Sequence, residues 1–321
     1  MNDVTHVFIT VDVEVWPPYW GADGAILQDA FRRYIYGVGR PAQYGLPYQL
    51  AMLADHGLRA VFFVEPLFAS VVGRGALAEV VGMILEAGQE VQLHLHPEWL
   101  GRANHPDLPG PHRLAIKDLA QDDQQRLITL GKHWLQEAGA PEITAFRAGS
   151  FGADHRTLAA ARANGITADF SQSAAGPHGP LDPSIPDDLS VTAEGVTEVP
   201  LTTYRDFTGR LRPLQVGSSG LAEIKTILES CVRQGRAVAT VLSHSAELLN
   251  STRRRGDTVA QRRFLGFCRY LDRHRDRLPT ATTDSLRSFN ASIEPRHVSA
   301  LRVPHMAAGV RYFEQLLRRS L

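Results

Sequence analysis

The sequence has little of several features that would place it in a specialised class of protein. Its two cysteines, Cys231 and Cys268, are far apart and lack metal-ligand spacing, so neither a disulfide framework nor a cysteine metal site is expected. The 34 basic residues equal the 34 acidic ones, whereas a general nucleic-acid binder carries a basic excess. No apolar run approaches the roughly 20 residues of a transmembrane helix. We therefore expect no nucleic-acid partner and no integral membrane segment.

Signals for secretion and for nucleotide binding are also missing. The first ten residues enter a strand pattern at once, without a basic start, a long apolar stretch or a cleavage site. This pattern predicts a cytoplasmic protein, although a chain trimmed of a signal peptide would look the same. No Gly-x-Gly-x-x-Gly follows the first strand, and no glycine-rich loop ends in Lys-Ser/Thr. A dinucleotide-binding fold is therefore not expected.

What the sequence does contain is a regular alternation of strand and helix patterns. Seven or eight such units with apolar strands predict a parallel sheet covered by helices, and 321 residues suit one α/β barrel with insertions. We predict a distorted (β/α)7–8 barrel at residues 1–290 and an extension at 291–321 that carries an amphipathic helix at 308–319. The expected strands are 7–13, 59–65, 90–96, 143–148, 166–170, 196–204 and 236–243, and the expected helices are 47–57, 75–87, 115–138, 154–163, 220–234 and 258–276.

Two of the expected strands end in pairs of residues that can bind a metal. Asp12 and Glu14 close the first strand, and His94 and His96 close the third. Residues i and i+2 of a strand point to one side, and parallel strands of a barrel end at one mouth. A solvated strand end or a pair of hydrogen-bonded core histidines would explain either pair alone. Together the pairs favour a catalytic zinc site, which uses three protein ligands and a water.

Three further polar residues lie at the ends of other strands. Arg147 lies on an apolar strand and needs an acidic partner, for which Asp12 is the natural candidate. His244 ends the most apolar strand, where an acid–base group would lie in a barrel, and Asp169 is expected to orient it. The simpler explanations are a structural ion pair for Arg147 and a turn-forming role for Asp169. Their shared position at strand ends favours catalysis.

Three segments outside the strands carry less specific signals. The insert at 16–47 is rich in aromatic residues, and it either contributes Trp16 to a capped substrate pocket or covers the barrel end with ordinary core. Trp99, directly after the histidine pair, is expected at the substrate site. The run of three arginines at 253–255 predicts a solvated helix start or a phosphate clamp. The extension at 291–321 is expected to pack on the barrel or to form a homo-oligomer contact, and binding to a membrane surface is a less favoured alternative.

The order and spacing of these motifs resemble the polysaccharide deacetylase family (NodB-like, carbohydrate esterase family four) over roughly residues 5–290. The family's first motif, Thr-Phe-Asp-Asp, is similar to residues 10–14, which implies that Asp12 is the general base and Glu14 the acidic metal ligand. The fifth motif, Leu-x-His, resembles residues 242–244. It implies that Leu242 lines an acyl pocket and that His244 is the general acid.

The other motifs depart from the family pattern. The second, His-Ser/Thr-x-x-His, resembles His94-Leu95-His96 with a shorter spacing, and both histidines are kept as metal ligands. The third, Arg-x-Pro-aromatic, resembles residues 147–151, where Gly149 replaces proline and the aromatic residue is displaced to Phe151. The resemblance implies that Arg147 orients the base and that Phe151 forms a wall of the substrate groove. The fourth motif matches loosely at Asp169.

The resemblance implies an enzyme that uses a divalent metal, with zinc expected, to remove an N-acyl group from an amino sugar or sugar conjugate in glycan biosynthesis. The expected partner is therefore a small-molecule or glycan substrate. Two alternatives stay open at this point. One is an amidohydrolase of the same fold that acts on a formyl, cyclic imide or ureide group. The other is a catalytically silent barrel that binds carbohydrate.

Overall fold

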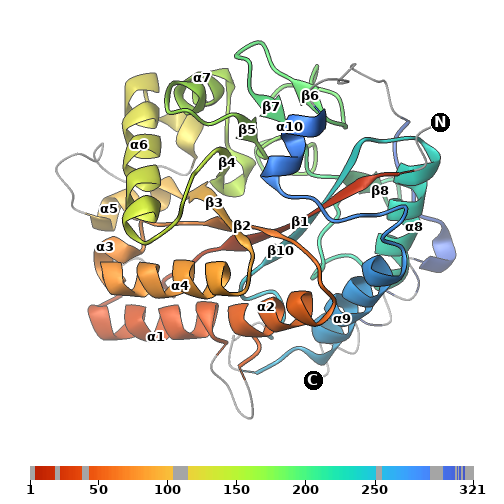
Figure 1. The fold of residues 1–321 in the computed structure, drawn as a ribbon, viewed down its shortest axis with the longest axis horizontal. Helices are drawn as coiled ribbons and strands as arrows, with labels where there is room; N and C mark the ends of the chain where they lie inside the picture. The colour runs from red at the N-terminus through yellow and green to blue at the C-terminus, as the bar shows by residue number, and fades with distance from the viewer. Residues whose placement is uncertain are drawn as a thin grey trace.

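An eight-stranded, mostly parallel sheet forms the centre of the molecule (Figure 1). The computed structural model describes residues 4–18, 22–37, 43–103, 115–250, 255–289, 299–307, 309, 311 and 314. The strand order is β10–β1–β2–β3–β4–β5–β7–β6, and all neighbours are parallel except β6 and β7. The sheet curls into a half-barrel, which confirms the predicted distorted barrel. Its strands are β1 (His6–Val13), β2 (Val61–Val64), β3 (Glu90–Leu95), β4 (Ala145–Ala148), β5 (Ala168–Asp169), β6 (Ser190–Val191), β7 (Thr197–Glu198) and β10 (Val238–His244).

Helices pack around the outside of this sheet (Figure 1). The predicted helix at 115–138 begins later than expected, because residues 116–118 form a separate 3-10 turn before it. The α-helices are α1 (Gly24–Ile35), α2 (Leu46–Asp55), α3 (Ala69–Val72), α4 (Arg74–Glu86), α5 (Leu100–Ala103), α6 (Gln121–Glu137), α7 (His155–Ala163), α8 (Leu221–Arg233), α9 (Thr258–Arg273) and α10 (Leu286–Phe289), and the 3-10 turns are η1 (Pro97–Trp99), η2 (Ile116–Asp118), η3 (Gly149–Phe151) and η4 (Thr283–Ser285). None of the helices in the described part of the chain has the length and apolar character needed to cross a membrane.

Strand alternation divides the core into an outer and an inner cluster. Val7, Ile9 and Val11 of β1 belong to the large cluster under the helices, whereas Phe8 belongs to a smaller cluster with Phe63. Side chains of one parity therefore face the helices, and those of the other parity face the hollow of the curled sheet. On β1 and β10, polar residues on the inner side follow Phe8 and Val238 toward the carboxyl ends, where Asp12 and His244 belong to the candidate site.

Four of the described α-helices were not predicted, namely the short helices α3, α5 and α10 and the longer α1. The sequence of α1 lies in the aromatic-rich insert that we expected to be a loop. Asp23 caps its first turn, since the Asp23 Oδ1 atom accepts a hydrogen bond from the Ile26 N–H (3.0 Å). The helix buries Leu27, Phe31 and Ile35 against the core. The cap residue followed by apolar positions with helical spacing was the available signal. The insert therefore contributes ordinary core in this part, which was one of the two alternatives.

The strand predicted at 196–204 is broken into two pieces. β7 ends at Glu198, and β8 (Thr203–Arg205) pairs instead with β9 (Leu211–Pro213) in a two-stranded antiparallel sheet. Pro200 lies in the break, where a missing N–H interrupts any ladder. The chain then runs along the outer edge of β10, where the Leu242 N–H donates to Leu214 O (2.9 Å) and the Val216 N–H donates to Leu242 O (3.0 Å).

The described part of the C-terminal extension lies against the barrel. The Arg205 N–H of β8 donates to Leu301 O (2.9 Å), which adds a short strand-like pairing to β8. Arg311 is buried and forms an ion pair with Glu223 of α8 (2.9 Å). Of the residues that carry the amphipathic prediction, Val310, Phe313, Leu316 and Leu317 lie outside the described residues, as do Arg253 and Arg254. The predicted boundary at residue 290 stays a prediction.

Candidate metal centre and active site

The register of the sheet brings four of the predicted site residues together. β1 pairs with β10 so that Asp12 lies opposite His244, and β3 pairs with β4 so that His94 lies opposite Arg147. All four residues have the inward parity of their strands. The site therefore lies at the carboxyl ends of the central strands, as parallel α/β topology predicts.

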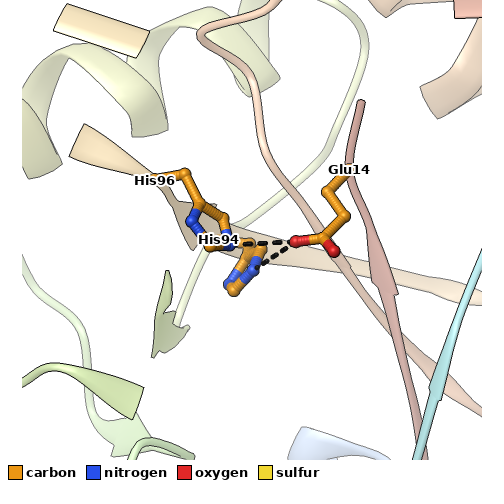
Figure 2. A group of neighbouring side chains, drawn as sticks. All are labelled: Glu14, His94 and His96. Carbon is orange, nitrogen blue, oxygen red and sulfur yellow. Dashed lines mark ion pairs between the residues drawn. The ribbon is translucent and has the colours of Figure 1, made fainter. Parts of the chain in front are cut away.

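Three residues from the ends of β1 and β3 form a cluster that can hold a metal ion. The Glu14 Oε2 atom lies 2.9 Å from His96 Nε2 and 3.5 Å from His94 Nε2. Dashed lines mark these two ion pairs in Figure 2. One ligand atom from each of Glu14, His94 and His96 lies within 4.8 Å of the other two. Two imidazoles and one carboxylate form the ligand set of many catalytic zinc sites.

The tautomer of His94 leaves a lone pair aimed at this cluster. The Nδ1 atom lies 2.8 Å from the backbone carbonyl oxygen of Arg147. Because a carbonyl only accepts, Nδ1 carries the proton and Nε2 of the neutral ring is a bare acceptor. His94 is 1% exposed, and its Nε2 has no hydrogen-bond partner within the described residues. A buried acceptor without a donor, held by a backbone carbonyl on its other nitrogen, fits a metal ligand.

His96 is held between two carboxylates. Its Nε2 faces Glu14, and its Nδ1 lies 3.2 Å from the Glu98 Oε2 atom. Burial lowers the pKa of His96, but Glu14 and Glu98 outweigh burial and raise it to about 10. Burial raises the pKa of Glu14, but the contacts with His94 and His96 outweigh burial and hold this pKa well below its usual range. The centre is thus built to hold positive charge. Glu98 escaped the sequence analysis, although its position two residues after His96 was a signal.

Asp12 lies beside the Glu14–His94–His96 cluster and is hydrogen-bonded to Arg147. The Arg147 NH1 atom donates to Asp12 Oδ1 (2.6 Å), and its NH2 donates to Thr10 Oγ1 (3.0 Å). The other carboxylate oxygen of Asp12, Oδ2, lies 3.9 Å from His94 Nε2. Arg147 is fully buried, and its Nε donates to the carbonyl of Phe170 (3.2 Å). The structure therefore contains the pair expected from the sequence, with one Asp12 oxygen left toward the centre.

His244 faces the cluster from the β10 side. Its Nε2 lies 4.0 Å from Glu14 Oε1, and its side chain is 29% exposed. Its Nδ1 lies 2.6 Å from the Glu247 Oε2 atom. Burial lowers the pKa of His244, and Glu247, Glu14 and Asp12 outweigh burial and raise it to about 9.

Asp169 does not orient His244, so this prediction was wrong. Asp169 pairs in register with Phe146, whose parity is outward, and accepts hydrogen bonds from the Ser171 N–H (2.8 Å) and hydroxyl (2.9 Å). Burial raises the pKa of Asp169. Burial and the neighbouring Asp169 together raise the pKa of Glu198 well above its usual range. The strand β5 has only two residues, so its sequence shows no alternation from which the face of Asp169 could be predicted.

The predicted substrate-binding residues divide into two groups. The Trp16 ring lies edge-on to His96 with centroids 4.6 Å apart, and Phe151 is partly buried near Arg147, whose guanidinium carbon is 5.8 Å from its ring centroid. Leu242 is buried on the inward side of β10, opposite Thr10. Trp99, by contrast, is fully buried in the outer hydrophobic cluster. It cannot touch a substrate there, so its assignment to the site was wrong.

The turn after β4 approaches His96 closely. A Cβ atom on Gly149 would lie 2.6 Å from His96 Nδ1 and 2.7 Å from the Leu95 carbonyl oxygen. Ser150 and Phe151 follow with φ angles of 53° and 59°, a left-handed conformation that bulky residues rarely adopt. The glycine in place of the family's proline therefore has a local cause, because the His96 ring occupies the space of any Cβ.

The chain matches no protein-family profile and no curated protein sequence. Among solved structures it is similar to a Mycobacterium smegmatis protein assigned as a polysaccharide deacetylase, with a TM-score of 0.59 and 15% identity over 94% of this chain and 96% of that chain. It has the fold of the polysaccharide deacetylases. A peptidoglycan N-acetylglucosamine deacetylase also matches, with a TM-score of 0.43 and 13% identity over 89% of each chain.

The same fold also carries other chemistry. The 4-alpha-glucanotransferase of Thermococcus litoralis matches with a TM-score of 0.52 and 10% identity over 99% of this chain and 47% of that one. A shared fold therefore does not assign a reaction, and the function of this chain has to be argued from its own side chains.

Proposed function

We propose that this protein is a zinc-dependent hydrolase that removes an N-acyl group, in the first place acetyl, from an amino sugar or a sugar conjugate. The observation that carries the proposal is the bare, buried Nε2 of His94, which points at Glu14 and lies 3.9 Å from a carboxylate oxygen of Asp12. Ligand atoms, a base and an acid thus converge on one point. The fold supports the proposal, because its similar structures include a protein assigned as a polysaccharide deacetylase.

The metal would be held by Glu14, His94 and His96. A divalent ion held there would lower the pKa of a water molecule and polarise an acyl carbonyl group. Asp12 takes the proton of the attacking water, and Arg147 holds this carboxylate in position. His244 donates a proton from Nε2 to the leaving amine from the opposite side of the cluster. Phe151 and Leu242 enclose the acyl group, and Trp16 contacts the sugar.

The test is zinc content together with product release. The purified protein should contain about one equivalent of a divalent metal by mass spectrometry, and it should release free amine from N-acetylglucosamine oligomers or their conjugates. Release from a formyl, cyclic imide or ureide substrate, with none from any N-acetyl sugar, would identify the alternative amidohydrolase. Glycan binding without release from any substrate would identify a silent binding barrel.

A further inference from the structure

We propose that Glu247 is the positioning residue of His244, and that Gln215 and Gly217 hold Glu247 in place for this task. The proposal rests on the proposed function, because it assigns the carboxylate that prepares the general acid of that reaction. The sequence pointed to Asp169 for this role. The structure instead supplies a carboxylate from the turn directly after His244, in an environment built around it.

The contact between the two side chains is short and local. The Glu247 Oε2 atom lies 2.6 Å from His244 Nδ1, and the Glu247 backbone N–H donates to His244 O (3.0 Å). The same carbonyl of His244 accepts from the buried Gln49 side chain (2.8 Å). Backbone and side chain of His244 are thus fixed by separate groups.

Gln215 holds the Glu247 carboxylate in place. Its amide nitrogen donates to both Glu247 oxygens, at 3.1 and 3.0 Å. The same nitrogen lies 3.4 Å from His244 Nδ1, much farther than the 2.6 Å between this Nδ1 and Glu247 Oε2. In its ionised form the Glu247 carboxylate has no proton to donate and can only accept from the imidazole. The Nδ1 atom of His244 therefore carries a proton, and Nε2 is the nitrogen that faces Glu14 across 4.0 Å.

The room for Glu247 is made by a glycine. A Cβ atom on Gly217 would lie 1.5 Å from the Glu247 Oε1 atom, so this side chain occupies the space above the Gly217 Cα. The Gly217 carbonyl accepts from the NH1 atom of Arg263 (3.1 Å), a residue that is 1% exposed. The segment is also tied to β10 through the Val216 N–H, which donates to Leu242 O (3.0 Å). Residue 215 therefore has a fixed position beside the end of β10.

This arrangement specifies the path of the proton. In the breakdown step the C–N bond of the substrate breaks and its electron pair goes to nitrogen. The His244 Nε2–H bond breaks as its proton moves to that nitrogen. His244 is left as the neutral tautomer with hydrogen on Nδ1, which is the tautomer that Glu247 stabilises. Without the carboxylate, the ring would rotate and would populate both tautomers.

The experiment compares two leaving groups in Glu247→Ala, with Glu137→Gln as the control. Glu137 accepts from His133 (3.2 Å) in a pair that is exposed and far from the site. On an N-acetylglucosamine substrate, kcat of Glu247→Ala should fall roughly 10²-fold at nearly constant KM and zinc content. On 4-nitrophenyl acetate, whose leaving group needs no proton, the loss should stay below about threefold. Equal losses on both substrates, or loss of zinc, would show a merely structural role and overturn the proposal.

A second variant leaves both side chains in the protein. Gly217→Ala should displace Glu247 and reproduce the selective loss on the amide substrate. Gly75→Ala is its matched control, because a Cβ atom on Gly75 meets nothing within 4 Å. If Gly217→Ala behaves like Gly75→Ala on the amide substrate, the placement of Glu247 is not what the reaction needs.

A spectroscopic readout keeps the proposal testable if the proposed function fails. The ring Nδ1–H proton of His244 should give a downfield, slowly exchanging NMR resonance in the wild-type protein, and Glu247→Ala should lose it. Absence of amine release by the wild-type protein would overturn the proposed function and leave this resonance as the test of Glu247. A resonance that persists in Glu247→Ala would overturn the inference itself.

Discussion

The two ends of β3 carry polar side chains on the same inward face. At the amino end these side chains are hydrogen-bonded to other groups of the protein, whereas at the carboxyl end one buried nitrogen has no hydrogen-bond partner among the described residues. At the amino end, Gln92 accepts from the backbone N–H groups of Thr144 (2.9 Å) and Ala145 (2.8 Å) and donates to Glu90 (2.6 Å). Glu90 in turn accepts from the Thr283 N–H (3.0 Å) and from its hydroxyl. At the carboxyl end, His94 keeps a buried nitrogen that no described group satisfies.

This difference separates a structural polar cluster from a functional one. Burying a polar group is costly unless a partner replaces water, so the amino end is closed by its own hydrogen bonds. The carboxyl end concentrates carboxylates and imidazoles whose geometry leaves a site for a cation. Strand parity alone does not distinguish the two ends, because Glu90, Gln92, His94 and His96 all share one parity.

The largest effect is expected for His94→Ala at the carboxyl end. Removal of one of three ligands should reduce zinc content to background, and turnover should fall with it. Mass spectrometry of the purified variant measures the metal, and amine release measures turnover. Full zinc occupancy in His94→Ala would show that the centre lies elsewhere.

Asp12→Asn should abolish turnover without emptying the centre. An amide cannot take the proton of the attacking water, so we expect a fall in kcat of roughly 10²–10⁴. Zinc content should stay at the wild-type value, because Asp12 is bound to Arg147 and is not one of the three proposed ligands. Loss of zinc would mean that Asp12 and Glu14 share the role of ligand.

Gly149→Ala should weaken the centre through His96. The added Cβ would overlap the His96 ring, so the ligand has to move and zinc affinity should fall about 10- to 100-fold. Competition with a chelator of known affinity measures this change. Gly82→Ala is the control, since a Cβ atom on Gly82 of α4 meets nothing within 4 Å.

Gln92→Ala tests the amino end of β3. Unlike the variants at the carboxyl end, it should reduce the stability of the fold and leave zinc binding and turnover intact. It leaves two buried backbone N–H groups without their acceptor, which should reduce the free energy of unfolding by about 2 kcal/mol. Zinc content and kcat per folded molecule should remain unchanged. Denaturant unfolding of the wild-type protein and of Gln92→Ala measures the difference in stability. Loss of zinc from Gln92→Ala would contradict the distinction between a structural amino end and a functional carboxyl end of β3.

The smallest expected effect is the release of a proton when zinc binds. The pKa of His96 is raised to about 10, so in metal-free protein at pH 8 this ring is charged and must lose a proton to bind zinc. Zinc binding at pH 8 should therefore release about one proton from His96, and this release should disappear as the pH rises above 10. Calorimetry in buffers of different ionisation enthalpy measures it. Glu98→Gln removes one of the two groups that raise this pKa and should reduce the release.

Periodic patterns made most of the fold and the ligand cluster predictable. Alternation on β1 and β3 was enough to bring Glu14, His94 and His96 together, because the parity of a strand decides which side chains share a face. The helix α1 was not predicted, because the aromatic residues of this insert were interpreted as a loop that lines a substrate pocket or covers the barrel end. Asp23 was nevertheless a suitable helix cap.

Contacts that depend on loops could not be read from the sequence. Glu247 reaches His244 only because the turn after β10 folds back, and Gln215 comes from a segment whose path along β10 no local pattern specifies. Trp99 follows the histidines in sequence, yet the 3-10 turn η1 rotates it into the core. Proximity along the chain was therefore misleading for Trp99, whereas Glu98 and Glu247 do contact the histidines that they follow in sequence.

The segment that covers the outer edge of β10 has a consequence for the protein in concentrated solution. A strand at the border of a sheet normally presents free N–H and C=O groups, which a strand of another molecule can use to extend the sheet. Here the N–H and the C=O of Leu242 are both taken by residues 214–216, which include the glutamine that holds Glu247. The same stretch of chain therefore guards against edge-to-edge aggregation and supports the acid, so substitutions that loosen it should reduce solubility together with turnover.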